Sequence, residues 1–486
     1  MTQAPQPKTT TESPDPRRWL VLLVTSLGGF MGALMFTSVN VALPDMLNSL
    51  ETEFRNVQWV ILSYLLAAGT LLPIVGRLAD MLGKRLLYMS GYLIFTLGCL
   101  LSGVAPDVLT LIAARTVQGV GSAFLTALSI AIITDIFPTS ERGRAIGISG
   151  SVLSVGIVAG PTLGGLLVDA FSWRWIFLPA FPVGLLGAVL AYRLIPPYER
   201  TEGGRFDIWG ALLLFCGLLS LLLGLTFGQT LGFSANPIVV LLTASALLLG
   251  VFVWLELRVT DPIIELRLFR NPGLSIGLAT GFTTFVAISG AIFLLPFYLS
   301  NVLGYSPREV GFLLSINPIL LTFSAPIAGY LADRIGERPI TVFGMASLLI
   351  GYILLGDLSE KTTTVGYLLR FFPIGLGMGV FQTPNNSAIM GSVPKGRSGV
   401  AGGLLALTRT LGNTTGIAVL GTIWAVSVLR RSPGLSEATA AAGEVQVAAL
   451  SEMFFLIQIV IGLGLLLVLW DAYRRARSSA LRSKPS

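Results

Sequence analysis

The sequence GRLADMLGKR at residues 76–85 decides the fold, because a close copy, GYLADRIGER, follows at residues 329–338. Gly, Leu, Ala, Asp, Gly and Arg recur in the two copies at identical spacing, 253 residues apart. Each copy is a short polar segment between two long apolar runs. The chain is therefore predicted to consist of two halves that arose by parallel duplication.

The composition around these segments is that of a membrane protein. Of 486 residues, 53% are hydrophobic and 12% are charged, and the mean hydropathy is +0.79. A soluble domain carries about 25% charged residues, so soluble enzymes, nucleic-acid-binding proteins and disordered chains are excluded. The chain is expected to lie in a lipid bilayer. Its net charge of +7 therefore does not indicate nucleic-acid binding.

Apolar runs of about 20 residues are long enough to cross a bilayer as helices. They are continuously apolar, which excludes a transmembrane barrel with its alternating pattern. The sequence predicts an all-α membrane protein with fourteen transmembrane helices, at 19–43, 57–75, 86–105, 108–131, 145–169, 174–194, 207–229, 236–257, 272–299, 308–330, 339–357, 364–390, 398–428 and 447–472.

The repeat divides these helices into two six-helix bundles with two inserted linker helices. The predicted segments are an N-terminal tail (1–18), a first bundle (19–198), a linker (199–270), a second bundle (271–472) and a basic tail (473–486). Parallel repeats related by an axis along the membrane normal are typical of transporters whose substrate site lies between the halves, near the midplane.

Basic residues predict the orientation. Segments on the side of the N-terminus hold 23 Lys and Arg residues, and segments on the other side hold six. Positively charged loops stay in the cytoplasm, so both termini are expected there. The polar stretch 1–18 lacks the features of a cleaved signal peptide, and the first span is expected to be retained.

Several motifs resemble the major facilitator superfamily. The segment 76–85 looks like its signature loop, Arg115 to Gly121 is similar to its intramembrane Arg-Gln-Gly motif, and residues 156–165 look like the motif of its exporters and antiporters. Residues 40–44 and 382–387 resemble its fourteen-helix drug:proton antiporter branch. The resemblance implies a monomeric secondary transporter of small molecules in the inner or plasma membrane, commonly an exporter.

The repeated loop is predicted to gate the transporter. In the family this loop latches the two halves together on the cytoplasmic side. Asp80 is expected to pair with Arg142 or Arg144, or with the positive N-terminal end of a neighbouring helix. A simple topology anchor is the alternative interpretation. The candidate gating residues are Gly76, Asp80, Gly83, Arg85, Arg144, Gly329, Asp333, Gly336 and Arg338.

A stripe of small residues marks the fifth span. Gly156, Gly160 and Gly164 are four residues apart and share one helix face, where they allow close packing. Pro161 removes a backbone donor, and Gly165 follows directly. The resemblance implies that this stripe packs against span 10 or 11 and helps to set which side opens; plain packing is the alternative.

Three arginines lie within spans, and no carboxylate lies clearly at a span centre. Arg115, with Gln118 one turn later, and Arg409 are candidates for substrate binding or coupling; Arg115 could instead reach the membrane surface. The antiporter branch usually has Asp five residues before Asn40, where this chain has Met35, whose thioether cannot titrate. A coupling proton, or another ion, would then need a different group, and Glu452 is the candidate.

Uncharged polar residues within spans are further candidates for lining the substrate site, because they are costly against lipid. They are Asn40, Asn317, Gln382, Asn385 and Asn386, with hydrogen bonds between helices as the alternative role. Phenylalanines of span 9, among them Phe293 and Phe297, could line an apolar pocket or simply pack.

The favoured hypothesis is an exporter of amphipathic or hydrophobic small molecules that works by alternating access. Intramembrane arginines without acids favour the alternative of an anionic metabolite or lipid as cargo. A membrane enzyme is disfavoured, since the chain has no His and no credible nucleophile–base pair, and a sensor or scaffold is a distant alternative. No cofactor and no metal site are expected, and no Walker motif for ATP binding is present.

Overall fold

The computed structural model describes residues 16–197, 207–259, 266–393 and 398–482, and this part of the chain is helical with short connections. The first half contains α1 (Arg18–Ser49), α2 (Phe54–Leu82), α3 (Lys84–Gly103), α4 (Val108–Ile136), α5 (Thr139–Ala170) and α6 (Ala180–Leu194). The inserted helices are α7 (Ile208–Leu231) and α8 (Asn236–Glu256).

The second half contains α9 (Pro272–Phe297), α10 (Pro307–Ile335), α11 (Glu337–Leu355), α12 (Thr364–Gly391), α13 (Ser398–Thr415), α14 (Gly421–Arg431) and α15 (Gly443–Arg482). A π-helical turn, η4 (Gly416–Leu420), joins α13 and α14 into one long rod. Another π turn, η3 (Tyr298–Val302), ends α9. The described residues thus form fourteen rods of membrane-spanning length, as the apolar runs predict.

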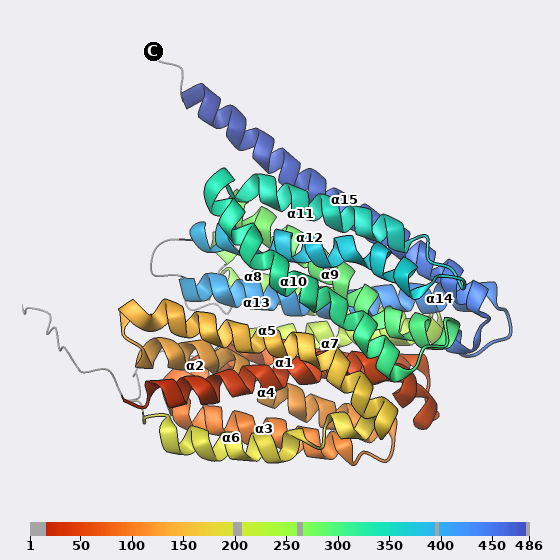
Figure 1. Ribbon diagram of the computed structural model, residues 1–486, viewed down its shortest axis with the longest axis horizontal. Helices are drawn as coiled ribbons and strands as arrows, with labels where there is room; N and C mark the ends of the chain where they lie inside the picture. Colours follow the sequence, from red (N-terminus) through yellow and green to blue (C-terminus); the bar gives the residue numbers. More distant parts are fainter. Residues whose placement is uncertain (1–15, 198–206, 260–265, 394–397, 483–486) are drawn as a thin grey trace, which may run out of the picture.

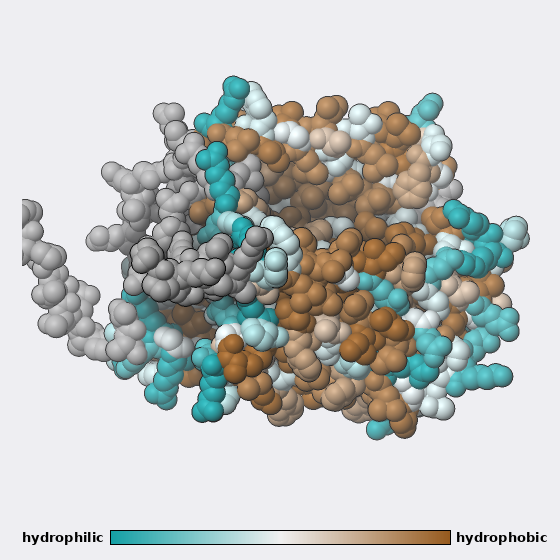
Figure 2. Space-filling view, turned by 90° about the horizontal axis from the view of Figure 1, so that it is seen from above, coloured by the Kyte–Doolittle hydropathy of each residue, from teal (hydrophilic) through white to brown (hydrophobic). Residues whose placement is uncertain are grey.

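Thirteen of these rods are apolar and long enough to cross a membrane. The other is α2, which has 29 residues and packs between α4 and α7. α15 continues to Arg482, so the segment predicted as a separate basic tail begins as an extension of the last helix. Figure 2 shows a broad hydrophobic belt with hydrophilic residues gathered at both ends, the distribution expected of a chain surrounded by lipid.

Local chemistry explains where several helices start and turn. Asp107 accepts a hydrogen bond from the Thr110 backbone N–H at the start of α4, and Ser306 and Glu309 form a capping box at the start of α10. Gly83 and Gly336, at equivalent positions of the repeat, have φ angles of 91° and 94°. Both lie in the region that favours glycine, so the two copies make the same turn.

The two halves lie side by side, with α1–α6 below and α9–α15 above in Figure 1. α1 begins and α15 ends at the same end of the molecule, on the left. We call this end the terminal face and the other end the opposite face. α5 packs against both α1 and α10, and α2 packs against both α4 and α13, so these helices join one half to the other.

Candidate functional site

The first seam between the halves joins α5 and α10 near the opposite face. A β-carbon on Gly165 would lie 2.4 Å from the Pro307 carbonyl oxygen, and one on Gly311 would lie 2.3 Å from that of Pro161. Only glycine permits such close approach of two backbones. The hydroxyls of Thr162 and Ser315 are 2.7 Å apart and join the same helices by a hydrogen bond.

The second seam joins α2 to the rod of α13 and α14. The Gln58 side chain is fully buried and donates to the Ile417 carbonyl over 2.6 Å. Ile417 belongs to the π turn η4, whose altered hydrogen-bond pattern is a feature often found at functional sites. Further along α2, a β-carbon on Gly69 would lie 2.5 Å from the Thr410 methyl carbon, so the helices are in close contact there as well.

Four aromatic rings cap this seam at the opposite face. Phe54 of the first half has its ring centroid 5.4 Å from that of Phe293, 5.2 Å from Phe297 and 5.0 Å from Trp424, all in the second half. All four are buried. We call these residues the aromatic cap; its tilted and edge-on pairs are each worth about 0.5–1.5 kcal/mol beyond the buried area.

Glu437, in the loop between α14 and α15, covers the start of α2. Its carboxylate accepts a hydrogen bond of 3.2 Å from the Phe54 backbone N–H. Burial raises the pKa of Glu437 above its ordinary value of 4.5, and nearby Glu53 adds to this, while the hydrogen bond and Arg55 oppose it. A titratable group therefore lies directly on the contact that closes the opposite face.

Toward the terminal face both seams part. Gly147 and Gly165 are eighteen residues, or five turns, apart and share a face of α5. At Gly165 this face touches α10, whereas a β-carbon on Gly147 would meet no atom within 4 Å. Gly403 lies two turns before Thr410 on α13 and is likewise open. The halves thus meet at the opposite face and separate toward the terminal face.

Arg409 lies at the closed end of this opening. It is exposed although it lies about a third of the way along the membrane-length rod of α13 and α14. Its neighbour Thr410 contacts α2, and Gly412 packs on Phe285 of α9. Arg409 therefore lies on the face of α13 between the side that meets α2 and the side that meets α9. No carboxylate of the described chain lies within ion-pair distance of it. A guanidinium there can bind a negatively charged or hydrogen-bond-accepting group.

Arg115 and Gln118, in contrast, lie inside the first half. Both are fully buried, Arg115 donates to the Val60 carbonyl over 3.0 Å and to the Gln118 side chain, and its guanidinium lies 4.4 Å from the Tyr64 ring centroid. Gln118 in turn donates to the Cys99 sulfur over 3.0 Å. Arg115 therefore does not reach the membrane surface, the alternative that the sequence left open.

The uncharged candidates are dispersed. Asn40 is buried and donates to the Phe36 carbonyl of its own helix. Asn385 donates to the Gly277 carbonyl over 3.1 Å and ties α12 to α9. Asn317 of α10 is buried with its side-chain oxygen unpaired, and Gln382 of α12 is half-buried. Asn385 thus makes the interhelical bond that was the alternative role for these residues.

The structure does not support Glu452 as a substitute coupling group. Its carboxylate forms an ion pair with Arg431, accepts a hydrogen bond from Ser427, and its side chain is 52% exposed. These residues lie where α14 ends, at the opposite face, on the contact between α14 and α15. Met35 is buried in α1. Within α1 the sole carboxylate is that of Asp45, ten residues further on.

The expected partner of the glycine stripe is wrong. β-Carbons on Gly156, Gly160 and Gly164 would all meet α1, at Phe30, Thr37 and Ser38 respectively. The reason is helical geometry: adjacent residues point about 100° apart, so Gly164 faces α1 while Gly165 faces α10. The contact between the halves belongs to Gly165 and to the carbonyl of Pro161, one residue away from the stripe.

The repeated loops lie at the terminal face, where the seams are open. Arg142 donates to the Phe137 carbonyl, and the Arg144 guanidinium lies 5.3 Å from the Trp19 ring centroid. The side chain of Asp80, like those of Arg77 and Met81, lies outside the described part, so its expected pairing is untested; Gly76 lies in α2 beside it. Gly329 lies close to Thr383.

The remaining loop residues have distinct environments. Arg85 lies 4.2 Å from the Tyr192 ring centroid. Arg338 pairs with Asp471 of α15 over 3.3 Å, and Asp333 is exposed. Among the residues described, no group of three or more His, Cys, Asp or Glu side chains could hold a metal ion.

Sequence reasoning missed several residues that join the halves. Gln58, Ser315 and Glu437 belong to no recognised motif, Thr162 is an unspecified position within the motif at 156–165, and Phe54 is a single aromatic residue at a helix start. The available signal was the polarity of Gln58 within an apolar run. Nothing in the sequence alone indicates that Glu437 would reach Phe54, 383 residues away.

Comparison with known proteins identifies the family. The sequence profile of the Major Facilitator Superfamily matches residues 25–417. Multidrug resistance protein Stp of Mycobacterium tuberculosis is 35% identical over 407 residues, 84% of this chain and 76% of Stp. Riboflavin transporter RibZ of Clostridioides difficile is 31% identical over 417 residues, 85% of this chain and 89% of RibZ.

A solved structure has the same fold. It is the inward-facing, occupied form of a bacterial homologue of the human lysosomal transporter Spinster, with a TM-score of 0.68 and 17% identity over 95% of this chain and 98% of that one. Two six-helix halves with two inserted helices, the profile match and the relatives lead to one conclusion. The chain is a multi-pass membrane protein and belongs to the Major Facilitator Superfamily.

Proposed function

We propose that this protein is a secondary active exporter of amphipathic small molecules, in which the two halves alternately open the terminal and the opposite face. The observation that carries the proposal is the asymmetry of the seams. Gly165 and Gln58 join the halves at the opposite face, while Gly147 and Gly403 border open space toward the terminal face. The similarity to Stp, named a multidrug resistance protein, supports export of drug-like molecules.

The proposed orientation places the terminal face in the cytoplasm. The 23 basic residues in segments on that side, against six on the other, support it. The conformation described here is then open to the cytoplasm, ready to take up a molecule for export. We propose the inner or plasma membrane as its location, a monomer as its working state, and bundles at 19–198 and 271–472 joined by the linker 199–270.

The proposed substrate site is the closed end of the terminal opening, at Arg409. The other candidates, Asn40, Asn317 and Gln382, are proposed to contribute polar contacts nearby, whereas Arg115 and Gln118 support the first half from within. The repeated loops are proposed to latch the terminal face when it closes. We also propose that transport is coupled to a proton or another ion. The coupling group is neither the side chain at position 35, which is Met35, nor Glu452.

Arg409 also favours a second candidate function, export of an anionic metabolite or lipid. An exposed guanidinium without a carboxylate partner in the described chain attracts anions and repels cations. The similarity to RibZ, named a riboflavin transporter, supports cargo other than cationic drugs. The two functions share one fold and one mechanism and differ in the charge of the substrate.

The test is transport by purified protein in liposomes with an imposed pH gradient, using a cationic dye and an anionic amphiphile. If the protein exports drugs, the pH gradient should drive movement of the dye. If it exports anions, the amphiphile should move, and Arg409→Gln should abolish that movement. The matched control is Arg370→Gln, because Arg370 pairs with Asp357 near the opposite face. Movement of neither compound under any gradient would contradict the proposed function.

A further inference from the structure

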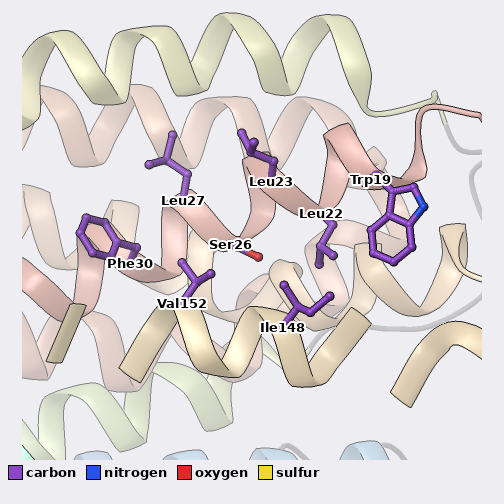
Figure 3. A pocket seen from close by; sticks show the side chains of 8 residues that line it. All are labelled: Trp19, Leu22, Leu23, Ser26, Leu27, Phe30, Ile148 and Val152. Atoms are coloured by element: carbon purple, nitrogen blue, oxygen red, sulfur yellow. The ribbon is translucent and has the colours of Figure 1, made fainter. Parts of the chain in front are cut away.

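An apolar groove runs between α1 and the terminal half of α5, outside the seams. It has a volume of about 460 Å³ and is lined by Leu22, Leu23, Ser26, Leu27, Phe30, Trp19, Ile148 and Val152. Figure 3 shows Ile148 and Val152 pointing from α5 toward α1. The groove exists because Gly156 packs closely on Phe30, while α5 lies farther from α1 toward its start.

The groove faces the bilayer and not the opening between the halves. Val152 and Leu163 are eleven residues apart and share a face of α5. Leu163 is exposed at a level where Thr162 and Gly165 hold the halves together, so this face meets lipid. On α1, Leu23 at the rim of the groove is 57% exposed. The groove is therefore separate from the proposed substrate site.

One polar group is aimed into the groove without a partner. The Ser26 side chain is 4% exposed, and its hydroxyl has no hydrogen-bond partner in the described chain. In Figure 3 this oxygen lies between Leu22, Val152 and Ile148. An unpaired buried hydroxyl is costly, and a ligand with an acceptor oxygen would satisfy it.

The terminal end of the groove is basic and amphipathic. Arg17 and Arg18 directly precede Trp19 at the start of α1, and Arg142 and Arg144 lie in the first turns of α5, where Glu141 pairs with Arg18 over 3.0 Å. The Arg144 guanidinium lies 5.3 Å from the Trp19 ring centroid, and tryptophan is typical of the membrane–water boundary. Excess positive charge beside an apolar groove is complementary to an anionic lipid headgroup.

We propose that this groove binds an anionic phospholipid of the leaflet on the terminal side. The acyl chain lies along Leu22, Leu27 and Phe30, an ester carbonyl accepts a hydrogen bond from Ser26, and the phosphate lies beside Arg144. A bound lipid fills the space between α1 and the terminal half of α5. It thereby supports the arrangement in which the terminal face is open, a role distinct from that of the transported substrate.

The test is native mass spectrometry of the full chain, released from detergent with palmitoyl-oleoyl phosphatidylglycerol or the matching phosphatidylethanolamine. We expect the wild type to retain phosphatidylglycerol preferentially. Arg144→Gln should weaken retention about fivefold, since one arginine near an anionic lipid contributes about 1 kcal/mol. Val152→Trp should abolish retention of both lipids by filling the groove.

The matched control is Arg308→Gln, because Arg308 also lies beside an aromatic ring, that of Phe312, but at the opposite end of the molecule. It should retain phosphatidylglycerol as the wild type does. Equal retention of both lipids by the wild type, or unchanged retention by Arg144→Gln and Val152→Trp, would overturn the proposal. If Val152→Trp does not fold, Ser26→Val replaces it and should weaken retention of both lipids without changing the elution of the protein.

Discussion

Single glycines determine how closely the two halves approach each other. Gly165 meets backbone atoms of α10 at distances that no side chain permits. We expect Gly165→Ala to cost about 1–3 kcal/mol, the usual penalty for overfilling a packed contact. Thermal unfolding of the purified protein, followed by tryptophan fluorescence, measures this loss.

The control for this substitution is Gly250→Ala in α8, because a β-carbon on Gly250 would meet no atom within 4 Å. It should leave the midpoint of unfolding unchanged or raise it, since alanine favours helix over glycine. If Gly165→Ala had the same unfolding midpoint as the wild type, the seam would accommodate the added β-carbon without loss of stability.

Residue types were predictable from the sequence, but their surroundings were not. The motif around Arg115 places a charge inside a span, yet only the fold shows the guanidinium enclosed by Val60, Gln118 and Tyr64. Arg409 also lies within a span, yet it is exposed. Whether a residue within a span meets protein, lipid or an opening depends on neighbouring helices, which periodicity alone does not specify.

At the scale of helices, the aromatic cap packs the start of α2 against α9 and α14. Removing the Phe54 ring deletes three aromatic contacts between the halves. We expect Phe54→Ala to shift the protein away from the conformation that is open at the terminal face. A cysteine at Gly403, which borders the opening, should then react several-fold more slowly with a water-soluble thiol reagent in a Cys216→Ala background.

The control for the aromatic cap is Phe171→Ala. The Phe171 ring packs at a tilt against the Trp175 ring at the same end of the molecule, but both residues belong to the first half. This variant should label at the wild-type rate. Faster labelling of the Phe54→Ala protein would mean that the cap holds the opposite face open and not closed.

Glu437 makes the same closure sensitive to pH. Its pKa is raised above 4.5 while it is buried against α2, and it should return to its ordinary range if the opposite face opens. The conformation with the higher pKa binds more protons, so acidification favours the closed opposite face. Labelling at Gly403→Cys should therefore rise as the pH falls through the raised pKa toward 4.5, after correction for the reactivity of a free thiol.

Glu437→Gln keeps an acceptor for the Phe54 N–H but cannot titrate. In this variant the acid-dependent rise should disappear, while Glu444→Gln, at the start of α15, serves as the control and should keep it. A rise of equal size in Glu437→Gln would assign the pH effect to another group, with Glu53 as the nearest acid that acts on Glu437.

The helices themselves were largely predictable, because length and continuous apolarity determine a membrane span. The matched turns at Gly83 and Gly336 likewise follow from the repeated sequence. The π turn at residues 416–420 was not predictable, since its residues are ordinary helix-compatible types. Its effect is specific, because it belongs to the segment that presents the Ile417 carbonyl to Gln58.

At the scale of the molecule, the inserted helices make the two seams unequal. α7 packs along α2 and α14, where the Arg55 guanidinium lies 5.7 Å from the Phe227 ring centroid and Thr422 donates to the Leu225 carbonyl. The seam of α2 thus has an additional helix beside it. The sequence predicted the insertion of two helices but not their position, because their apolar surfaces carry no directional signal.

The alternation of the two faces can be tested by locking one seam. The hydroxyls of Thr162 and Ser315 are 2.7 Å apart, so cysteines at both positions are close enough to be cross-linked when the opposite face is closed. We expect oxidation of the Thr162→Cys, Ser315→Cys protein to lower the transport rate at least tenfold. Chemical reduction of the disulfide should restore the rate. The locked protein should still bind substrate from the terminal face, because the opening beside Gly147 and Gly403 is unaffected. The control pair, Gly103→Cys and Leu178→Cys, joins the end of α3 to the segment before α6 within the first half, because a β-carbon on Gly103 would lie 2.5 Å from the Leu178 side chain; its oxidation should leave transport intact. Full transport by the cross-linked seam would mean that the halves do not separate at the opposite face during the cycle.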